Sequence, residues 1–307
     1  MTKTATIPWG QFSTKHKAYI KTALRNRMCV AEGAIRSGKT IDHCIISAAY
    51  LEETPDRFHL ASGSTIGNAK LNIGVCNGFG LEALFRGRCR WGKYRDNEAL
   101  FIQTKTGEKI VIFVGGAKAD SYKRILGNSY GLWIATEINE HFDSSDSRSS
   151  FLKVATGRQI AAQRPFTLWD LNPCNPKASI YEDYIDKYRE QGLAGGYLYQ
   201  HFTIKDNATI TPERIAEIES RYDPNTVWYR RDILGERAVA EGLIYQLFAD
   251  QPGRFIVDEL PHITRATIGV DFGGGTSAHA FCCLGYYGGS VVVLDEYRET
   301  EALNPTK

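Results

Sequence analysis

The chain has 307 residues, of which 43% are hydrophobic and 23% are charged, a balance that predicts a globular protein with a hydrophobic core. Its 37 basic and 35 acidic residues give a net charge of +2, which neither requires nor excludes a nucleic-acid partner. No apolar run approaches the roughly 20 residues that a membrane-spanning helix needs, so we expect no membrane association.

The seven cysteines show no C-x-x-C spacing. This argues against a zinc site and against a disulfide framework, and it favours reduced thiols in a cytosolic protein.

The first 27 residues carry six Lys or Arg and no acid. This composition resembles an organelle targeting peptide. The alternative is a basic helix that belongs to the fold, with Ser13 or Thr14 as its N-cap. We favour the helix, because the motif described next follows too closely for the segment to be dispensable.

A phosphate-binding motif lies between a predicted strand at 28–32 and a predicted helix at 37–53. Backbone N–H groups and the positive helix end would then face an anion. Lys39 would reach the β- and γ-phosphates, the Thr40 hydroxyl would bind Mg²⁺, and Arg36 would add a cation. The alternative is a glycine-rich turn without a ligand. The motif G-x-x-x-x-G-K-T comprises Gly33, Ala34, Ile35, Arg36, Ser37, Gly38, Lys39 and Thr40.

Strands and helices alternate from residue 28 to about 205. This alternation predicts an α/β fold with a mainly parallel sheet covered on both faces. Further apolar patterns predict strands at 57–63, 130–138 and 164–173, a helix at 149–162, and a hairpin at 99–116 that turns at Gly107.

An ATPase needs an acid at the end of a second strand. The run Leu132 to Ala135 delivers Thr136 and Glu137, and Glu137 is our candidate base for the attacking water. Asp is usual where Thr136 stands, so metal binding should be weakened. A solvated surface Glu is the alternative interpretation, and Glu140 is a lesser candidate acid.

Asn172 ends the predicted strand at 164–173. It could sense the γ-phosphate and relay its loss. Together with Pro173 it is equally an ordinary turn opener, and on the residues alone we favour the turn.

The remainder of the chain changes character twice. Residues 206–240 are helical and charged, and 241–262 have the pattern of a connector. Three strand-like runs follow at 266–271, 278–286 and 290–297.

Asp271 stands in the first of these runs, which we expect to be a buried strand, and glycines follow it. A buried carboxylate is costly unless something compensates it, and a divalent metal is the usual compensation. Asp295 and Glu296 are possible further acids of a two-metal nuclease site, although charged residues at a strand end are usually just solvated.

Several stretches, in one order, resemble the large terminase subunit of tailed bacteriophages, the motor that packages viral DNA. The resemblance implies a P-loop ATPase domain at 1–205, a helical lid and linker at 206–262, and the start of a ribonuclease-H-like nuclease domain at 263–307. The stretches are VAEGAIRSGKT, KRILGNSYGLWIATEINE, LWDLNPCNPKASIYEDYI, HFTIKDNATIT, YRRDILGERAVAEGLIY and IGVDFGGGTSA.

The resemblance also implies site roles and partners. Glu137 would be the hydrolytic acid, Asn172 would sit in the coupling motif, and Asp271 would be the first metal-binding acid of the nuclease. The cofactors would be ATP and Mg²⁺, with Mg²⁺ or Mn²⁺ at the nuclease. The partners would be double-stranded DNA, the portal of the procapsid, a small terminase subunit and further copies in a ring. The protein would work in the cytoplasm of an infected bacterium.

The chain departs from the family pattern at Thr136 and in the missing downstream nuclease acids, so we expect it not to cut DNA by itself. Two alternatives stay open at this point. One is a helicase-like P-loop ATPase, and the other is a catalytically weak nucleotide-binding module. A small-molecule phosphotransferase is least favoured, since no acceptor-binding pattern accompanies the loop.

Overall fold

The computed structural model describes residues 9–224, 226–238, 252–257, 259–272 and 279–299. The chain divides into two compact units, Met1–Glu241 and Gly242–Lys307, and each is described by itself.

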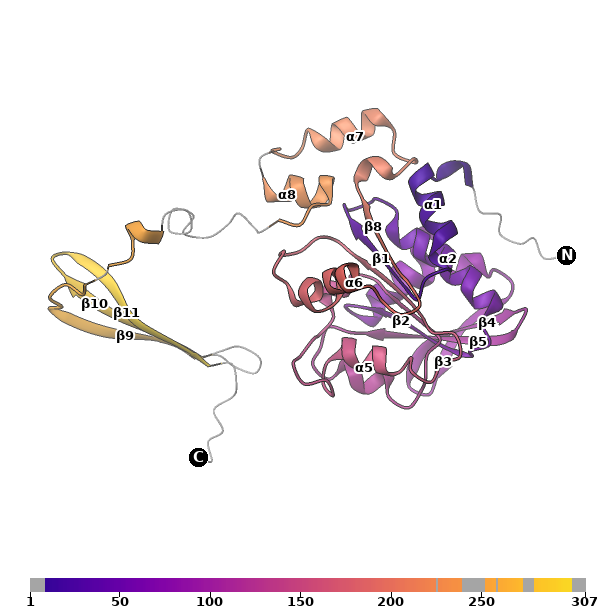
Figure 1. The fold of residues 1–307 in the computed structure, drawn as a ribbon, viewed down its shortest axis with the longest axis horizontal. Helices are drawn as coiled ribbons and strands as arrows, with labels where there is room; N and C mark the ends of the chain where they lie inside the picture. Colours follow the sequence, from indigo (N-terminus) through magenta and orange to yellow (C-terminus); the bar gives the residue numbers. More distant parts are fainter. Residues whose placement is uncertain (1–8, 225, 239–251, 258, 273–278, 300–307) are drawn as a thin grey trace. The chain divides into compact units, whose positions relative to one another are not determined.

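The first unit is built on an eight-stranded sheet with the order β3-β4-β5-β2-β6-β7-β1-β8 (Figure 1). The pairs from β5 through β8 are parallel, and β3 and β4 join antiparallel at one edge. The expected mainly parallel sheet is therefore confirmed. The strands are β1 (Met28–Gly33), β2 (Phe58–Gly63), β3 (Cys89–Tyr94), β4 (Asn97–Thr104), β5 (Gly107–Gly115), β6 (Leu132–Ala135), β7 (Phe166–Leu171) and β8 (Tyr197–Phe202).

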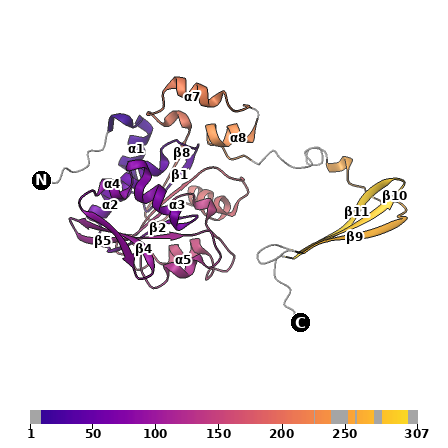
Figure 2. The ribbon, with the colours of Figure 1, turned by 180° about the vertical axis from the view of Figure 1, so that it is seen from behind.

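Helices cover both faces of this sheet. Figures 1 and 2 show α1 to α4 on one face and α5 and α6 on the other. The helices are α1 (Thr14–Ala23), α2 (Lys39–Glu53), α3 (Ile66–Ala69), α4 (Leu81–Leu84), α5 (Phe151–Gly157), α6 (Asp186–Gln191), α7 (Pro212–Glu219) and α8 (Val227–Tyr229). Short 3₁₀ or π turns are η1 (Trp9–Gln11), η2 (Lys70–Val75), η3 (Cys76–Gly78), η4 (Ser121–Ile125), η5 (Ile138–Glu140), η6 (Ile180–Ile185), η7 (Ile204–Asp206), η8 (Arg230–Leu234) and η9 (Pro252–Arg254).

The central strands are buried along their whole length, as parallel strands between two helical layers must be. Side chains alternate between the faces, and so they feed two separate cores. Leu168 packs with Ile46 and Tyr50 of α2, whereas Trp169 packs with Phe151 of α5 on the opposite face.

The helix expected near the start of the chain is present. The Ser13 side chain accepts a hydrogen bond from the backbone N–H of His16, which caps α1. Tyr19 and Ala23 of this helix are buried in the core beside α2. The segment from Ser13 onward is thus part of the fold, as we favoured.

The hairpin expected at 99–116 forms from β4 and β5, and Gly107 turns with a φ of +104°. Neither β3 nor β8 was predicted, although β8 pairs with β1 and completes the edge beside the phosphate-binding motif. The seven cysteines are free, as expected.

Residues 204–224 and 226–238 form a small helical layer within the first unit. Ile204 and Ile233 enclose Ala34 of the phosphate-binding motif, and α7 and α8 lie above them (Figure 1). Pro212 occupies the first turn of α7, as the sequence suggested, and Thr211 caps it.

The second unit contains an antiparallel sheet with the order β11-β10-β9. Its strands are β9 (Arg265–Asp271), β10 (His279–Tyr287) and β11 (Ser290–Glu299). All three strand-like runs are therefore confirmed as strands.

Our expectation that Asp271 lies in a buried strand is wrong. Every residue of β9 is exposed. The reason is that β9 is an edge strand, and no described helix of this unit covers its faces. The glycines at 273–275, which our argument also used, lie outside the described residues. Within the part of the chain that the structure describes, no helix is long and apolar enough to cross a membrane.

Candidate nucleotide-binding site

The phosphate-binding motif joins the end of β1 to the start of α2, as predicted. Gly33 has a φ of +148°, and a Cβ there would lie 1.8 Å from the backbone oxygen of Phe202 in β8. Gly38, with a φ of +100°, caps α2 in a left-handed conformation. Both positions therefore require glycine, because a side chain would clash at Gly33 and be strained at Gly38. The start of α2 opens at the end of this loop, while the N–H groups of Ala34 and Ile35 donate to Phe202 and Asp232.

Lys39 folds back into this loop and is only 6% exposed. Its Nζ donates to the backbone oxygens of Gly33 and Ala34, at 2.9 and 2.7 Å. Further bonds go to Ser37 Oγ and Asn172 Oδ1, both at 3.2 Å. Burial lowers the pKa of Lys39 to about 8, while nearby Asp170 and Glu32 oppose that shift. An anionic ligand in contact with this buried ammonium would favour its charged form.

Glu137 and Asn172 reach the same edge of the sheet as Lys39. They follow β6 and β7, and β7 lies between β6 and β1. Glu137 has a left-handed backbone with a φ of +53°, and Asn68 Nδ2 donates to its carboxylate at 3.0 Å. The structure therefore brings together the loop, Glu137 and Asn172, which the sequence had placed far apart.

The remaining candidate residues are placed differently. Arg36 is exposed at the tip of the loop with a φ of +56°, and its backbone oxygen accepts from Asn207 Nδ2 at 2.6 Å. Glu140 is exposed. Asp271 belongs to the second unit, where it lines an open hollow of about 590 Å³ together with Glu296. Among the described residues, no cluster of three His, Cys, Asp or Glu side chains could hold a metal.

Sequence reasoning missed Asp170, a buried acid of β7 that is 3% exposed. Its Oδ1 accepts from Thr136 Oγ1 and from the backbone N–H of Glu137, both at 3.1 Å. The sequence did contain a sign of its importance. Asp170 is the one acid in the apolar run of β7, and a charged residue inside a buried strand usually has a specific role.

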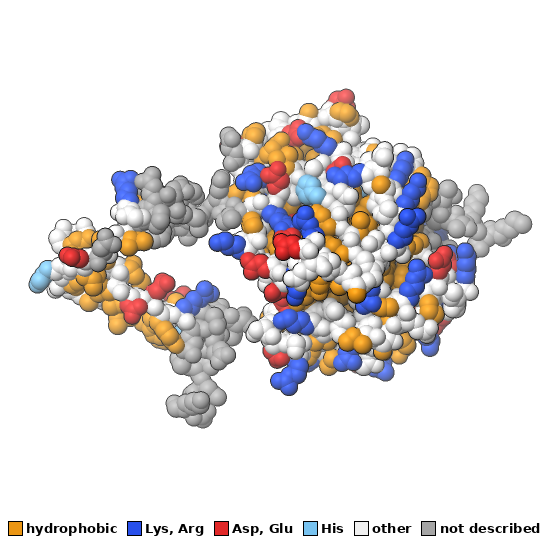
Figure 3. Space-filling view, viewed as in Figure 1, with side chains coloured by type: hydrophobic (Ala, Val, Ile, Leu, Met, Phe, Trp, Pro, Cys, Tyr) orange, Lys and Arg blue, Asp and Glu red, His pale blue; other side chains and the backbone are white. Residues whose placement is uncertain are grey.

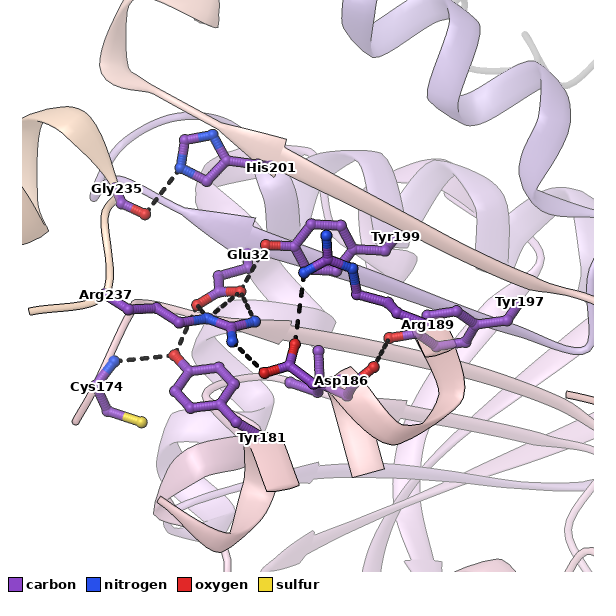
Figure 4. A network of polar contacts seen from close by, with 11 residues as sticks. Glu32, Cys174, Tyr181, Asp186, Arg189, Tyr197, Tyr199, His201, Gly235 and Arg237 are labelled. Atoms are coloured by element: carbon purple, nitrogen blue, oxygen red, sulfur yellow. Dashed lines mark hydrogen bonds and ion pairs between the residues drawn. The ribbon is translucent and has the colours of Figure 1, made fainter. Parts of the chain in front are cut away.

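A second missed feature is the polar network around Glu32, the residue before Gly33 (Figure 4). Glu32 is 1% exposed. Its carboxylate accepts from the Tyr181 and Tyr199 hydroxyls at 2.6 and 2.7 Å and from Arg237 Nη2 at 2.8 Å. Arg237 also pairs with Asp186 through Nη1 at 2.5 Å. Burial raises the pKa of both tyrosines, so they stay protonated and can donate.

A third missed feature is a cavity of about 90 Å³ beside the loop. Phe12, Ile41 and Phe79 give it apolar walls, while Gln11 and Asn207 supply amides. Apolar walls with a few polar groups are typical of ligand sites, which are usually several times larger than this cavity.

The wall of this cavity is rigid on one side. The His16 ring stacks on Phe202 with centroids 4.4 Å apart, and its Nδ1 bonds to Asp42 Oδ2 at 2.5 Å. Burial raises the pKa of Asp42 to about 6, and the His16 hydrogen bond opposes the rise.

On the face of the first unit seen in Figure 3, Lys and Arg side chains are scattered among hydrophobic and uncharged ones. The charge on this face therefore does not single out another ligand surface.

Comparisons with solved structures show a shared fold. The large terminase of a thermophilic bacteriophage, solved in complex with ADP, is 24% identical with a TM-score of 0.62 over 94% of this chain and 69% of that chain. The same protein has been solved with ATP-gamma-S.

Two further structures share the fold. The large terminase of bacteriophage HK97 is 15% identical with a TM-score of 0.52, over 96% of this chain and 65% of that one. A mutant ATPase domain of a Thermus phage large terminase is 14% identical with a TM-score of 0.51, over 73% of this chain and 93% of that one. A search of curated proteins finds no match.

The family model described as "Terminase large subunit, T4likevirus-type, N-terminal" matches residues 30–250, which is more than half of the chain. This match spans the loop, Glu137, Asn172 and the Glu32 network. The chain therefore belongs to the large terminase subunit family of bacteriophages.

Proposed function

We propose that this chain hydrolyses ATP as the motor subunit that drives double-stranded DNA into a procapsid. Membership in the terminase family supports this function, and it disfavours the helicase-like alternative. The observation that carries the proposal is the convergence at one sheet edge. Lys39 of the loop contacts Asn172, and Glu137 lies two residues after β6, which pairs with β7.

In this proposal the nucleotide lies along the start of α2. Its base packs against the small cavity lined by Phe12 and Phe79, and its phosphates meet the start of α2. Lys39 exchanges its bonds to Gly33 and Ala34 for bonds to phosphate oxygens. The ADP and ATP-gamma-S complexes of the related large terminase support nucleotide binding in general.

Mg²⁺ is the cofactor implied by this reaction, and the residues at the loop fit it. Thr40 stands in the first turn of α2, and a buried carboxylate, Asp170, lies near it. One oxygen of Asp170 accepts no hydrogen bond of ordinary geometry from a described residue. When bound, Mg²⁺ neutralises phosphate charge.

The catalytic roles follow from position. Glu137 accepts a proton from the attacking water or orients it, and Asn68 holds its carboxylate in place. Asn172, already in contact with Lys39, senses the γ-phosphate and relays its loss. Arg36 adds positive charge from the loop tip.

We propose the remaining roles on family grounds. Residues 1–205 form the ATPase domain, 206–262 the lid and linker, and 263–307 the start of a ribonuclease-H-like domain, with Asp271 as a metal-binding acid. The motor acts as a ring of copies with a small terminase subunit at the procapsid portal, in the cytoplasm of the infected host.

The test measures ATP hydrolysis by the purified chain with and without double-stranded DNA and procapsids. We expect DNA to stimulate hydrolysis, and we expect Lys39→Ala to abolish it while Lys177→Ala, an exposed control, does not. Strand separation on a forked duplex would instead favour a helicase. Nucleotide binding without turnover would favour a catalytically weak binding module.

A further inference from the structure

The position before Glu137 lacks the acid that an ATPase normally uses for its metal. Thr136 stands there, and it is only 2% exposed. Its hydroxyl donates to Asp170 Oδ1 at 3.1 Å. The residue that follows β6 is thus hydrogen-bonded to a carboxylate on the adjacent strand β7.

Asp170 occupies the centre of the site. It pairs in register with Ala31 of β1, two residues before Gly33, and β7 separates β1 from β6. Side chains alternate along a strand, so Asp170 shares with Leu168 the face that α2 covers. The carboxylate therefore points toward the helix that begins with Lys39 and Thr40.

The two oxygens of this carboxylate differ. Oδ1 accepts from Thr136 Oγ1 and from the backbone N–H of Glu137. Oδ2 is buried and accepts no hydrogen bond of ordinary geometry from a described residue, although the Thr40 hydroxyl lies near enough to lower the pKa of the carboxyl. His43 Nδ1 lies 3.9 Å from Oδ2, beyond hydrogen-bond distance.

A positive charge and two hydroxyl groups lie near the Asp170 carboxyl. Burial raises its pKa, and the charge of Lys39 opposes that rise most strongly. The hydroxyls of Thr40 and Thr136 act in the same direction as Lys39. A buried carboxylate oxygen without a donor is costly, and a hydrated divalent cation would satisfy it.

We propose that Asp170 supplies the carboxylate that binds Mg²⁺, directly or through its water, together with the Thr40 hydroxyl. It thereby replaces the acid that Thr136 does not provide. This inference rests on the proposed nucleotide-binding function. The competing explanation is structural, with Asp170 serving only to fix Thr136 and the Glu137 backbone.

The test compares the affinity for ATP-gamma-S in Mg²⁺ with that in EDTA, by isothermal titration calorimetry on the full chain. Asp170→Asn keeps the shape and the Oδ1 acceptor but removes the charge. We expect it to lose about 10- to 100-fold of the Mg²⁺-dependent gain in affinity, with the affinity in EDTA unchanged or higher. Electron paramagnetic resonance of Mn²⁺ with ATP-gamma-S should show the same loss of bound metal.

Moving the acid sharpens the test. Asp170→Asn combined with Thr136→Asp returns a carboxylate to the usual position, and we expect the Mg²⁺-dependent gain to recover. Asp56→Asn is the matched control. Asp56 lies just before the amino end of β2, at the end of the strands opposite to the nucleotide loop. Its carboxylate accepts hydrogen bonds from the backbone N–H groups of Gln163 and Arg164. We expect its metal dependence to match the wild type.

An Asp170→Asn variant that keeps the full Mg²⁺-dependent gain would overturn the proposal. Thr136→Val tests it independently, should Asp170→Asn fail to fold. Thr136→Val leaves the Asp170 carboxylate in place, so the gain should persist, and its loss would assign the metal to Thr136 instead. If the wild type binds no ATP-gamma-S in either buffer, the proposed function fails rather than the assignment of Asp170.

Discussion

Glu137 has a backbone that non-glycine residues rarely adopt, with a φ of +53°. Such a conformation costs free energy, and it persists where the surroundings hold it, often at functional sites. Here the N–H of Glu137 is bound by Asp170, and its carboxylate by Asn68. The arrangement fixes one carboxylate beside the loop at the expense of local strain.

We therefore expect Glu137→Gln to slow ATP hydrolysis by about 10²- to 10⁴-fold, because glutamine cannot accept the proton of water. ATP-gamma-S affinity should change little. Glu140→Gln, an exposed acid three residues later, is the control and should hydrolyse ATP at the wild-type rate. Single-turnover assays measure both. Equal slowing in the two variants would remove Glu137 from its assigned role.

His59 is a buried residue whose protonation opposes folding. Its Nδ1 accepts a hydrogen bond from the backbone N–H of Leu132 at 3.0 Å, and its Nε2 donates to the backbone oxygen of Asp56 at 3.1 Å. This pairing requires a neutral ring. Burial, with help from Lys109, lowers the pKa of His59 to about 3. His59 therefore stabilises the fold above its unfolded pKa of 6.5, and the contribution is lost as the pH falls from 6.5 toward 3.

By pH 5 this loss should reach about 2 kcal/mol for His59 alone. His59→Asn retains an acceptor for Leu132 but removes the titration. We expect its free energy of unfolding to lie below that of the wild type at pH 7.5, with a gap that narrows by about 2 kcal/mol at pH 5. Urea titrations at both pH values measure this gap.

At the scale of elements, an ion pair connects the end of β1 with the segment after η8. Arg237 binds Glu32 through Nε and Nη2 and reaches Asp186 next to η6. Figure 4 shows the tyrosines of η6 and β8 closing around the same carboxylate. Because Glu32 precedes Gly33 directly, this network links the nucleotide loop to the chain that leaves the first unit.

Removing Arg237 should cost far more than removing an exposed ion pair. Arg237→Met leaves Glu32 charged and buried, and we expect a loss of about 3–5 kcal/mol in the free energy of unfolding. Arg230→Met breaks an exposed pair with Glu236 and should cost less than about 1 kcal/mol.

A double variant separates the two possible causes of such a loss. Adding Glu32→Gln to Arg237→Met removes the buried charge and should recover part of the stability. Guanidinium unfolding followed by circular dichroism measures the free energy of unfolding of the wild type, the two single variants and the double variant. No recovery in the double variant would mean that lost packing, rather than an unpaired charge, causes the change.

The elements show where sequence reasoning works. Strands β1, β2, β6 and β7 are predictable because each is a short apolar run before a helix or turn. By contrast, β8 mixes aromatic residues with Gln200 and His201, and its strand form depends on pairing with β1. Strand β3 is a half-buried edge strand with a weak apolar pattern.

In the site, too, local patterns can be predicted and long-range contacts cannot. The loop is a local motif, so its eight residues can be predicted. Asp170 and Glu32 become meaningful only when β7 lies beside β1 and Arg237 returns from more than 200 positions away. Such non-local neighbours are set by the tertiary fold rather than by local pattern.

At the scale of the whole molecule, the described nucleotide site lies entirely within the first unit. The loop, Glu137, Asn172 and the cavity residues all precede residue 210, and Arg237 supplies the last contact of the network. The first unit also has its own hydrophobic cores on both faces of the sheet. These observations indicate that nucleotide binding does not require the second unit.

We therefore expect a variant that ends at Glu241, the boundary of the first unit, to fold by itself. It should bind ATP-gamma-S within about twofold of the full chain, because distant sites contribute almost independently. A variant that ends at Glu236 is the matched control. It lacks Arg237 but differs by only five residues, and it should lose stability as Arg237→Met does. Urea unfolding and calorimetric titration of the three proteins measure both properties. If the variant ending at Glu241 is unfolded or does not bind nucleotide, residues beyond it contribute to the site, and the division of labour between the two units is wrong.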